Sequence, residues 1–341
     1  MSDPIRLIDL GVAPFWQTQA VYHAVAGRMC ERTPDTIILT SPRTPYLCLG
    51  YHDSYDGVLD PEAVARRGLP VMRRRVGGGT TYLDAEQIFY QCVFHRRRVP
   101  AMFSAVYAKM LAAPLAVLRD LGLPSELRHT VELEVAGQRV AGIGGGRIGE
   151  ASVVVGNLLR DFDYQAMAEV WRAPWPGFRA LAAEALGERV TTLRRLGVDL
   201  PLDELTRRLR VAFAEALGRP LLPGRLTTAE ARYARRIGAR MLAPGSVDPC
   251  DHGGAPQGAR PLKVAGGVYI HAVESDLGGC RLRMSLRVHG ETIVTARVEP
   301  APGRDHTVIE RALADTPLAT WRDAIALRAD AMRLISAPPA A

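Results

Sequence analysis

One stretch of the chain constrains its fold and chemistry more than any other: Arg-Arg-Arg-Val-Gly-Gly-Gly-Thr-Thr-Tyr-Leu-Asp, residues 73–84. Glycine lets the backbone turn through positive φ and approach a ligand closely, because it carries no Cβ. Successive N–H groups in such a turn form a concavity that binds anions, and arginines supply planar cationic forks suited to phosphate or carboxylate. No Gly-Lys-Ser/Thr follows, so this is not a Walker loop. The stretch predicts capture of a nucleotide phosphate or an acyl-adenylate; the alternative is a glycine-rich hairpin with solvated arginines.

The composition is that of a globular protein long enough for two domains. Of 341 residues, 48% are hydrophobic and 23% are charged. The net charge of +7 favours an acidic partner or a nucleotide. Because Lys109 and Lys263 are the only lysines, an isolated arginine says little about function. The sequence has neither an apolar run of about 18 residues nor a signal-peptide pattern, so we expect a cytoplasmic protein without a membrane span.

The five cysteines argue against a metal or disulfide framework. Cys30, Cys48, Cys92, Cys250 and Cys280 are odd in number and widely spaced, and no Cys-x-x-Cys pair is present. Two of them, Cys48 and Cys92, lie in apolar strand-like runs. There we expect them to act as small buried hydrophobes.

Apolar periodicity and turn residues predict an α+β fold with a mixed sheet and flanking helices in residues 1–243. Helices are expected over residues 18–29, 61–67, 101–121, 202–217 and 227–242, and strands over 36–40, 46–50, 80–83 and 88–94. We expect the strands 80–83 and 88–94 to pair, and residues 131–135 and 139–142 to form a hairpin. A second glycine-rich passage, residues 142–149, predicts a loop that covers a bound ligand.

The last part of the chain predicts a second, smaller domain. Residues 244–261 are dense in proline and glycine and are the candidate linker. An accessory α+β domain is expected over residues 262–341. Its strands are predicted at 262–273, 279–288 and 292–298, and its helices at 307–313 and 321–335.

The pattern Arg-Arg-Arg-x-Gly-Gly-Gly-x-x-Tyr-x-Asp resembles the signature of the lipoate–protein ligase A family, which is related to biotin–protein ligases and octanoyltransferases. The resemblance covers nearly the whole chain, and Lys263–Ile270 is similar to the opening of the family's accessory domain. It implies that lipoate or octanoate is activated with ATP and Mg²⁺ to an acyl-adenylate. The acyl group then passes to a lysine of a lipoyl-carrier domain. We expect no nucleic-acid or membrane partner.

The resemblance also assigns site residues. Arg139 occupies the position of the family's catalytic lysine, and Glu132 is the candidate metal ligand. The residues expected to bind the substrate or adenylate are Arg73, Arg74, Gly77, Gly78, Gly79, Thr80, Tyr82, Gly142, Gly144, Gly156 and Asn157.

The chain departs from the family pattern at four polar sites, one of which is a pair of residues. An Asn-Asp pair is replaced by Val131-Glu132, the lysine by Arg139, and two histidines by Leu83 and Val155. Arginine keeps the positive charge but exchanges a compact ammonium for a wide planar fork. Because attack on the α-phosphorus depends on ångström-scale positioning, these changes point to altered or lost ligase chemistry.

Three functions therefore remain open at the level of sequence. The first is a divergent lipoate–protein ligase. The second is a non-catalytic lipoate- or nucleotide-binding protein on a ligase fold, which recognises a lipoyl domain or regulates a true ligase. The third, an octanoyltransferase, needs a nucleophilic thiol near a base, and no cysteine lies in or around residues 142–149.

Overall fold

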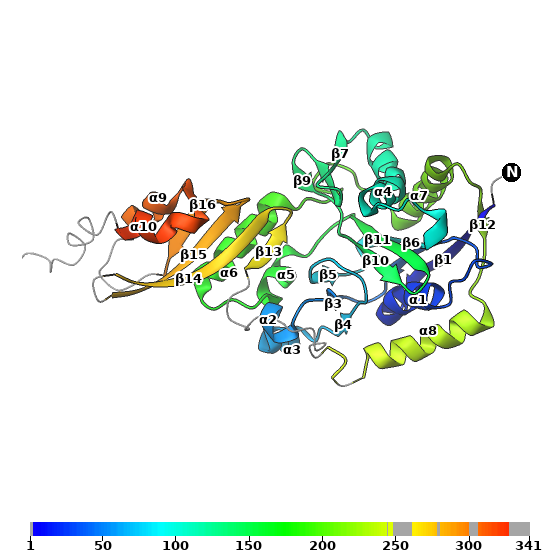
Figure 1. Cartoon of the computed structure of the whole chain (residues 1–341), viewed down its shortest axis with the longest axis horizontal. Helices are drawn as coiled ribbons and strands as arrows, with labels where there is room; N and C mark the ends of the chain where they lie inside the picture. Colours follow the sequence, from blue (N-terminus) through cyan, green and yellow to red (C-terminus); the bar gives the residue numbers. More distant parts are fainter. Residues whose placement is uncertain (1–2, 244, 248–260, 278–279, 300–305, 327–341) are drawn as a thin grey trace, which may run out of the picture. The chain divides into compact units, whose positions relative to one another are not determined.

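The fold is described from a computed structural model of the whole chain (Figure 1). The described residues are 3–243, 245–247, 261–277, 280–299 and 306–326. They divide into two compact units: residues 1–55, 64–163 and 190–252 make up the first, and residues 56–63, 164–189 and 253–341 make up the second. The domain boundaries drawn from the sequence stay a prediction. Most of the predicted linker, residue 244 and residues 248–260, lies outside the described residues.

The first unit is built on a six-stranded mixed sheet with strand order β10-β11-β6-β2-β1-β12. Its strands are β1 (Ile5–Ala13), β2 (Thr36–Pro42), β6 (Gln87–His95), β10 (Ile143–Ile148), β11 (Ala151–Leu159) and β12 (Leu221–Pro223). Strand β1 pairs in parallel with β2 and β12, and all other neighbours are antiparallel. The glycine-rich β10 is an edge strand, so one of its sides is free of sheet pairing.

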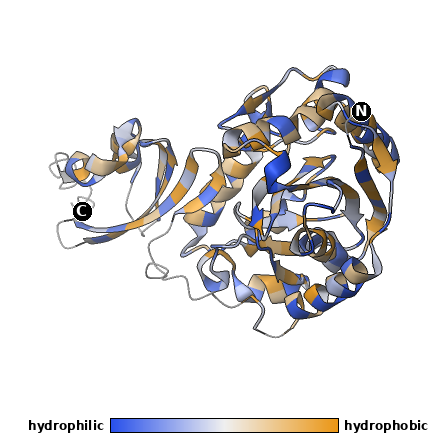
Figure 2. Ribbon diagram, turned by 45° about the vertical axis from the view of Figure 1, so that its right-hand side comes forward, coloured by the Kyte–Doolittle hydropathy of each residue, from blue (hydrophilic) through white to orange (hydrophobic). Residues whose placement is uncertain are grey.

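Helices cover both faces of this sheet, because alternate side chains of each strand point to opposite sides. On one face, Tyr90 and Cys92 pack against α4 (Phe103–Asp120) and α7 (Leu202–Leu217). On the other face, Ile38 and Val93 pack against α1 (Phe15–Gly27) and α8 (Thr228–Met241). Figure 2 shows apolar residues recurring along these strands and helices. The result is a three-layer core.

Two three-stranded sheets flank the large one in the first unit. The sheet β4-β3-β5 contains β3 (Tyr46–Leu49), β4 (Val71–Arg73) and β5 (Thr81–Leu83), and the sheet β7-β8-β9 contains β7 (Ser125–Arg128), β8 (Glu132–Val135) and β9 (Gln138–Arg139). The short helix η1 (Arg96–Arg98) belongs to this unit, whereas α2 (Tyr55–Val58) and α3 (Pro61–Arg67) each contain residues of both units. Because β4 ends and β5 begins on either side of residues 74–80, the small β3 sheet positions the arginine–glycine loop.

The second unit is an antiparallel sheet with order β13-β14-β15-β16-β17 and helices beside it. The strands are β13 (Leu262–Ala265), β14 (Val268–Leu277), β15 (Cys280–His289), β16 (Thr292–Val298) and β17 (Thr316–Pro317). The helices are α5 (Tyr164–Val170), α6 (Pro176–Arg189), α9 (Thr307–Leu313), η2 (Leu318–Thr320) and α10 (Trp321–Ala326). Its core contains Leu282, Leu286, Ile293 and Trp321.

The α+β class, the mixed sheet and most helices agree with the sequence prediction. Three predictions are wrong. Strand β5 pairs with β3 and not with β6, since β2 and β11 occupy both edges of β6. Residues 143–148 are strand β10 and not a loop. The predicted strand 262–273 is two strands joined by a turn at Gly267, where φ is +70°. Strand β1 was not predicted, and residues 327–335 of the last predicted helix lie outside the described residues.

Among the described residues, no helix combines the length and the apolar character needed to cross a bilayer.

Candidate functional site

Arg73, the first residue of the arginine–glycine loop, is buried and bound to backbone carbonyls. Its Nη1 donates to the carbonyl of Gly50 at 3.1 Å and to that of Asp53, and its Nη2 donates to the carbonyl of Val247 at 2.7 Å. The Nε atom is buried and has no hydrogen-bond partner among the described residues. Arg73 therefore fastens the loop to two other segments and keeps one donor unused.

Arg74 is also buried, and its guanidinium organises the loop itself. Nε donates to the carbonyl of Gly77 at 3.3 Å, Nη2 donates to that of Gly79 at 2.7 Å, and Nη1 donates to that of Cys48 at 3.1 Å. A planar fork with several fixed donors can serve three carbonyls in one plane, which a lysine cannot. In the structure both arginines bind carbonyls, so their contact with an anionic ligand stays a prediction.

These carbonyl contacts fix the direction of the loop's N–H groups. In a trans peptide the C=O of one residue and the N–H of the next point in opposite directions. Because the carbonyls of Gly77 and Gly79 turn toward Arg74, the N–H groups of Gly78 and Thr80 turn away from it. Neither N–H has a hydrogen-bond partner among the described residues, and Gly78 has φ +104°. Two N–H groups turned away from the guanidinium are suited to the anion binding predicted from the glycines, which stays a prediction.

The two glycine-rich passages pack backbone against backbone. The N–H of Gly77 donates to the carbonyl of Gly145 in β10 at 3.0 Å. A Cβ on Gly144 would lie 2.5 Å from the carbonyl oxygen of Gly77, and a Cβ on Gly50 would lie 2.0 Å from that of Gly78. Real Cβ atoms do not approach a backbone oxygen so closely, so glycine is required at both positions. The second passage thus supports the loop from the edge of the large sheet.

His23 of α1 binds the backbone of the arginine–glycine loop. Its Nε2 accepts a hydrogen bond from the N–H of Arg75 at 2.9 Å, so its Nδ1 carries the proton and donates to the carbonyl of Gln19 at 2.7 Å. Burial, together with the nearby Arg75 and Arg74, lowers the pKa of His23 from 6.5 to about 4. The imidazole is therefore neutral, and only the neutral form can accept from the loop.

This histidine makes the stability of the protein pH-dependent. The unfolded chain binds a proton near pH 6.5 and the folded chain only near pH 4, so the stabilisation is complete above pH 6.5 and is lost as the pH falls toward 4. We expect the free energy of unfolding to drop by about 2 kcal/mol between pH 7 and pH 5 through this group. Urea unfolding at both pH values measures the change. His23→Gln is the control and should remove this part of the pH dependence; equal profiles for the two proteins would contradict the assignment.

Arg139 lies in β9, within the small β7-β8-β9 sheet. Its Nη1 is 3.7 Å from Oε1 of Glu132, which is itself buried. Burial lowers the pKa of Arg139, and the carboxylates of Glu132 and Glu134 oppose this shift. The N–H of Thr191 donates to its backbone carbonyl at 2.8 Å. Arg139 thus stands as a cation beside two buried carboxylates, and its catalytic role stays a prediction.

The remaining predicted residues support the pairing of β6, β10 and β11. The side-chain oxygen of Asn157 accepts from the N–H of Gly142 at 2.5 Å, and its amide donates to Gln87 at 2.6 Å. A Cβ on Gly156 would lie 2.3 Å from the hydroxyl of Tyr90. These contacts explain why a buried amide and a glycine occupy these two positions. Their contact with a ligand stays a prediction.

Two further predicted residues flank the loop on its C-terminal side. The hydroxyl of Thr80 donates to Oδ2 of Asp53 at 2.7 Å. The ring of Tyr82 is buried and meets that of Phe162 edge to face at 6.1 Å. Both contacts tie the start of β5 to neighbouring segments.

No group of three or more histidine, cysteine, aspartate or glutamate side chains among the described residues is arranged to hold a metal ion. Glu132 is buried beside Arg139, so its charge is already opposed by a cation. Mg²⁺ therefore stays a prediction.

The thiol nearest the loop is unsuited to nucleophilic catalysis. Sγ of Cys48 is 3.6 Å from Nη1 of Arg74, but the residue is fully buried, and burial raises the pKa of its thiol. Cys92 is also buried, as predicted, whereas Cys30 is exposed. Cys250 and the side chain of Cys280 lie outside the described residues.

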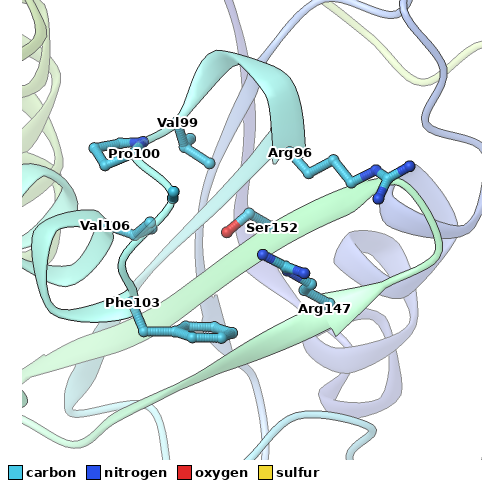
Figure 3. A pocket seen from close by; sticks show the side chains of 8 residues that line it. Arg96, Val99, Pro100, Phe103, Val106, Arg147 and Ser152 are labelled. Atoms are coloured by element: carbon cyan, nitrogen blue, oxygen red, sulfur yellow. The ribbon is translucent and has the colours of Figure 1, made fainter.

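One pocket of the first unit lies at the N-terminal end of α4 (Figure 3). It is lined by side chains from residues 96–106 and by Arg147 and Ser152. The Arg147 guanidinium lies over the ring of Phe103, 5.5 Å from its centre. None of the residues predicted for ligand binding lines this pocket.

Sequence reasoning missed three residues that shape the loop. His23, Gly50 and Asp53 precede the motif and meet it only through the fold. Arg75 belongs to the predicted motif, and its backbone N–H is what donates to His23. Of the three arginines, Arg75 has the exposed guanidinium.

Comparison with known proteins agrees with the fold described above. The chain is similar to octanoyltransferase LipM of Symbiobacterium thermophilum. The two are 28% identical over 259 aligned residues, which cover 68% of this chain and 93% of that protein. Two solved structures share the fold. One is a bi-partite lipoate protein ligase of Thermoplasma acidophilum, studied with its E2 lipoyl domain, at a TM-score of 0.66 and 19% identity, covering 72% of this chain and 96% of that one.

The other is a lipoate-protein ligase A bound with ATP, at a TM-score of 0.58 and 20% identity, covering 70% of this chain and 94% of that one. Residues 16–214, more than half of the chain, match the family described as the lipoyl protein ligase A/B catalytic domain. The matched range includes the arginine–glycine loop, β10, Arg139 and Asn157. The chain therefore belongs to the lipoyl protein ligase A/B catalytic domain family.

Proposed function

We propose that the protein is a divergent lipoate–protein ligase, which activates lipoate or octanoate with ATP and transfers the acyl group to a lysine of a carrier domain. The observation that carries this proposal is the pair of outward N–H groups at Gly78 and Thr80, which have no partner among the described residues. Such a pair suits the α-phosphate of an acyl-adenylate, because two fixed donors stabilise an anion without reorganising. The ATP-bound relative supports a nucleotide as substrate.

Different residues of the chain bind the phosphate and neutralise the charge that develops in the reaction. The N–H groups of Gly78 and Thr80 hold the phosphate, and Arg73 holds the neighbouring segments through its contacts with Gly50 and Val247. Arg139 neutralises the charge that develops as the carboxylate of the acid attacks the α-phosphorus and pyrophosphate leaves. The carrier lysine, as a neutral amine, then attacks the acyl carbon, and AMP departs. The lipoyl domain studied with the Thermoplasma ligase supports such a carrier as the partner.

Two alternatives each rest on one observation. The similarity to an octanoyltransferase favours transfer from an acyl donor without ATP. That route needs an accessible thiol, and of the three cysteines whose side chains are described, Cys48 and Cys92 are buried and Cys30 is exposed. The proximity of Arg139 to Glu132 favours a binding protein without catalysis, because the carboxylate offsets the cation.

The experiment that separates these functions supplies each donor in turn. The purified protein is incubated with ATP, Mg²⁺ and lipoate, and separately with an octanoylated carrier domain, and an apo lipoyl domain is added as acceptor. We expect mass spectrometry to detect lipoyl-adenylate and a lipoylated carrier in the first sample. Product only from the octanoylated donor would establish the transferase, and binding of ligand without either product would leave a binding protein.

A further inference from the structure

The pocket at the N-terminal end of α4 takes no part in the proposed reaction, yet hydrogen-bond donors line it (Figure 3). Its polar lining includes Arg147 of β10, Ser152 of β11 and Arg96 of η1, and its apolar lining includes Phe103 and Val106 of α4. Arg147 and Ser152 lie directly opposite each other in the β10–β11 ladder, so their side chains share one face of the sheet. We call this hollow the α4 pocket.

The hydroxyl of Ser152 is turned into the α4 pocket. The residue is 5% exposed, and its hydroxyl has no hydrogen-bond partner within the described parts of the chain. In Figure 3 its oxygen points toward the space between Val106, Phe103 and Arg147. Because a buried hydroxyl without a partner is unfavourable, this one indicates a bound group that completes its hydrogen bonding.

The first turn of α4 presents three further donors at the pocket. The N–H groups of Phe103, Ser104 and Ala105 have no hydrogen-bond partner among the described residues. The residue before the helix, Met102, has no side-chain oxygen with which to cap them, and the first turn contains no acidic side chain. Unpaired N–H groups and the positive end of the helix dipole attract anions. The charge favoured at this end of α4 is therefore negative.

The charged side chains at the α4 pocket also favour an anion. The guanidinium of Arg147 lies 5.5 Å from the centre of the Phe103 ring, and no carboxylate in the described part of the chain lies within 4 Å of it. Nε of Arg96 donates to Glu150 at 2.7 Å, and Glu150 also lies 3.8 Å from His95. The charge of Arg96 is therefore opposed, whereas Arg147 offers its charge and its donors to a ligand.

The α4 pocket and the arginine–glycine loop lie on opposite faces of β10. A Cβ on Gly144 would lie 2.5 Å from the carbonyl oxygen of Gly77 in the loop. A Cβ on the next residue, Gly145, would lie 2.5 Å from the hydroxyl of Tyr107 in α4. Because side chains alternate along a strand, Arg147 shares the face of Gly145. A ligand in the pocket is therefore distinct from the acid and the nucleotide of the proposed reaction.

We infer that the α4 pocket binds the phosphoryl group of a small ligand, which is either inorganic phosphate or the end of a phosphate monoester. The guanidinium of Arg147, the hydroxyl of Ser152 and the N–H groups of α4 come from three different elements. A tetrahedral oxyanion presents oxygens in several directions and can accept from all three, whereas the oxygens of a carboxylate lie in one plane. The pocket is small, so it holds this group and not a whole nucleotide. The inference does not depend on the proposed function.

Titration of the isotope-labelled, full-length protein with inorganic phosphate, followed by amide NMR signals, tests the site. We expect the signals of Phe103, Ser104 and Ala105 to shift and to saturate. The signals of Gly78 and Thr80 report separately on phosphate at the arginine–glycine loop. Shifts confined to Gly78 and Thr80 would overturn the inference. So would shifts at α4 that never saturate, since these indicate an adventitious ion only.

Two variants identify the side-chain donors. Ser152→Ala removes one neutral hydrogen bond and should weaken phosphate binding at α4 about fivefold. Arg147→Gln removes a charge-assisted one and should weaken it at least about tenfold. Both should leave the response of Gly78 and Thr80 unchanged, which also shows that the variants are folded. The matched control is Arg210→Gln, which changes an exposed arginine of α7 and should bind like the wild type. Equal weakening in the control, or none in the two variants, would overturn the inference.

Two further probes identify the ligand chemistry. Phe103 is 51% exposed and the neighbouring Met102 is 69% exposed, so an apolar group attached to a phosphate can pack beside the pocket. If phenyl phosphate binds at least about threefold more tightly than inorganic phosphate, the site takes a monoester; equal affinities assign it to free phosphate. Acetate should bind more weakly than both. Tighter binding of acetate would overturn the assignment to a phosphoryl group.

Discussion

Replacing Arg74 by methionine is expected to lower the free energy of unfolding by about 3 kcal/mol and to abolish binding of ATP. The guanidinium is buried and serves the carbonyls of Cys48, Gly77 and Gly79. A buried carbonyl that loses its partner costs about 1–3 kcal/mol, and the two loop carbonyls can reach water more easily than that of Cys48. Without the guanidinium the loop peptides are free to turn, so the outward N–H groups lose their fixed direction. Urea unfolding and calorimetric titration with ATP measure the two effects.

The matched control for this prediction is Arg75→Met. The side chain of Arg75 is exposed, so its removal should change stability by less than about 0.5 kcal/mol. Any loss of ATP affinity in this control would then reflect the lost charge and not a disordered loop. If Arg74→Met were as stable as the wild type and bound ATP equally well, the loop would not depend on Arg74.

Arg139→Ala is expected to reduce the rate of adenylate formation at least about 100-fold, which corresponds to about 2.7 kcal/mol of transition-state stabilisation. Arg139→Lys should have the opposite effect and raise the rate about tenfold, because a compact ammonium leaves room for the attacking carboxylate. Single-turnover formation of lipoyl-adenylate measures both.

The neighbouring carboxylate provides the control. Glu132 lies 3.7 Å from the guanidinium, so Glu132→Gln should raise the rate if the carboxylate restrains Arg139. Thermal unfolding of all three variants shows whether a change of rate follows from lost structure, since Arg139→Ala leaves Glu132 buried without its cation. Equal rates in Arg139→Ala and wild type would remove Arg139 from the reaction and favour the transferase or the binding protein.

Local signals in the sequence were sufficient for most of the helices. The bounds of α7 agree with the predicted residues 202–217, because proline precedes the helix and Gly218 ends it at φ +59°. Asp60 caps α3 as expected, with Oδ1 accepting from the N–H groups of Glu62 and Ala63. These features depend on residues a few positions apart, which a single sequence displays directly.

The errors concern contacts between distant parts of the chain. Strand β5 was expected to pair with β6 because the two are adjacent in sequence. The edge of β6 is instead paired with β11, which lies more than 50 residues further along the chain. The glycines of β10 suggested a flexible loop. In the structure they belong to a strand, and Gly144 has to be glycine because the backbone of Gly77 packs against it. Likewise, a sequence shows that Arg73 and Arg74 are cations but not whether carbonyls or a ligand receive their hydrogen bonds.

The contact between Gly77 and Gly145 also bears on how the site assembles. Its two residues are about 70 positions apart, so it closes a long segment and is expected to form late in folding. Strand β10 is an edge strand held only by β11, and edge hairpins open more often than the centre of a sheet. The amide of Gly77 should therefore exchange its hydrogen at the rate at which the β10–β11 hairpin opens. The anion-binding loop thus has the local stability of the sheet's edge, and a ligand bound there would slow the fraying of the β10–β11 hairpin.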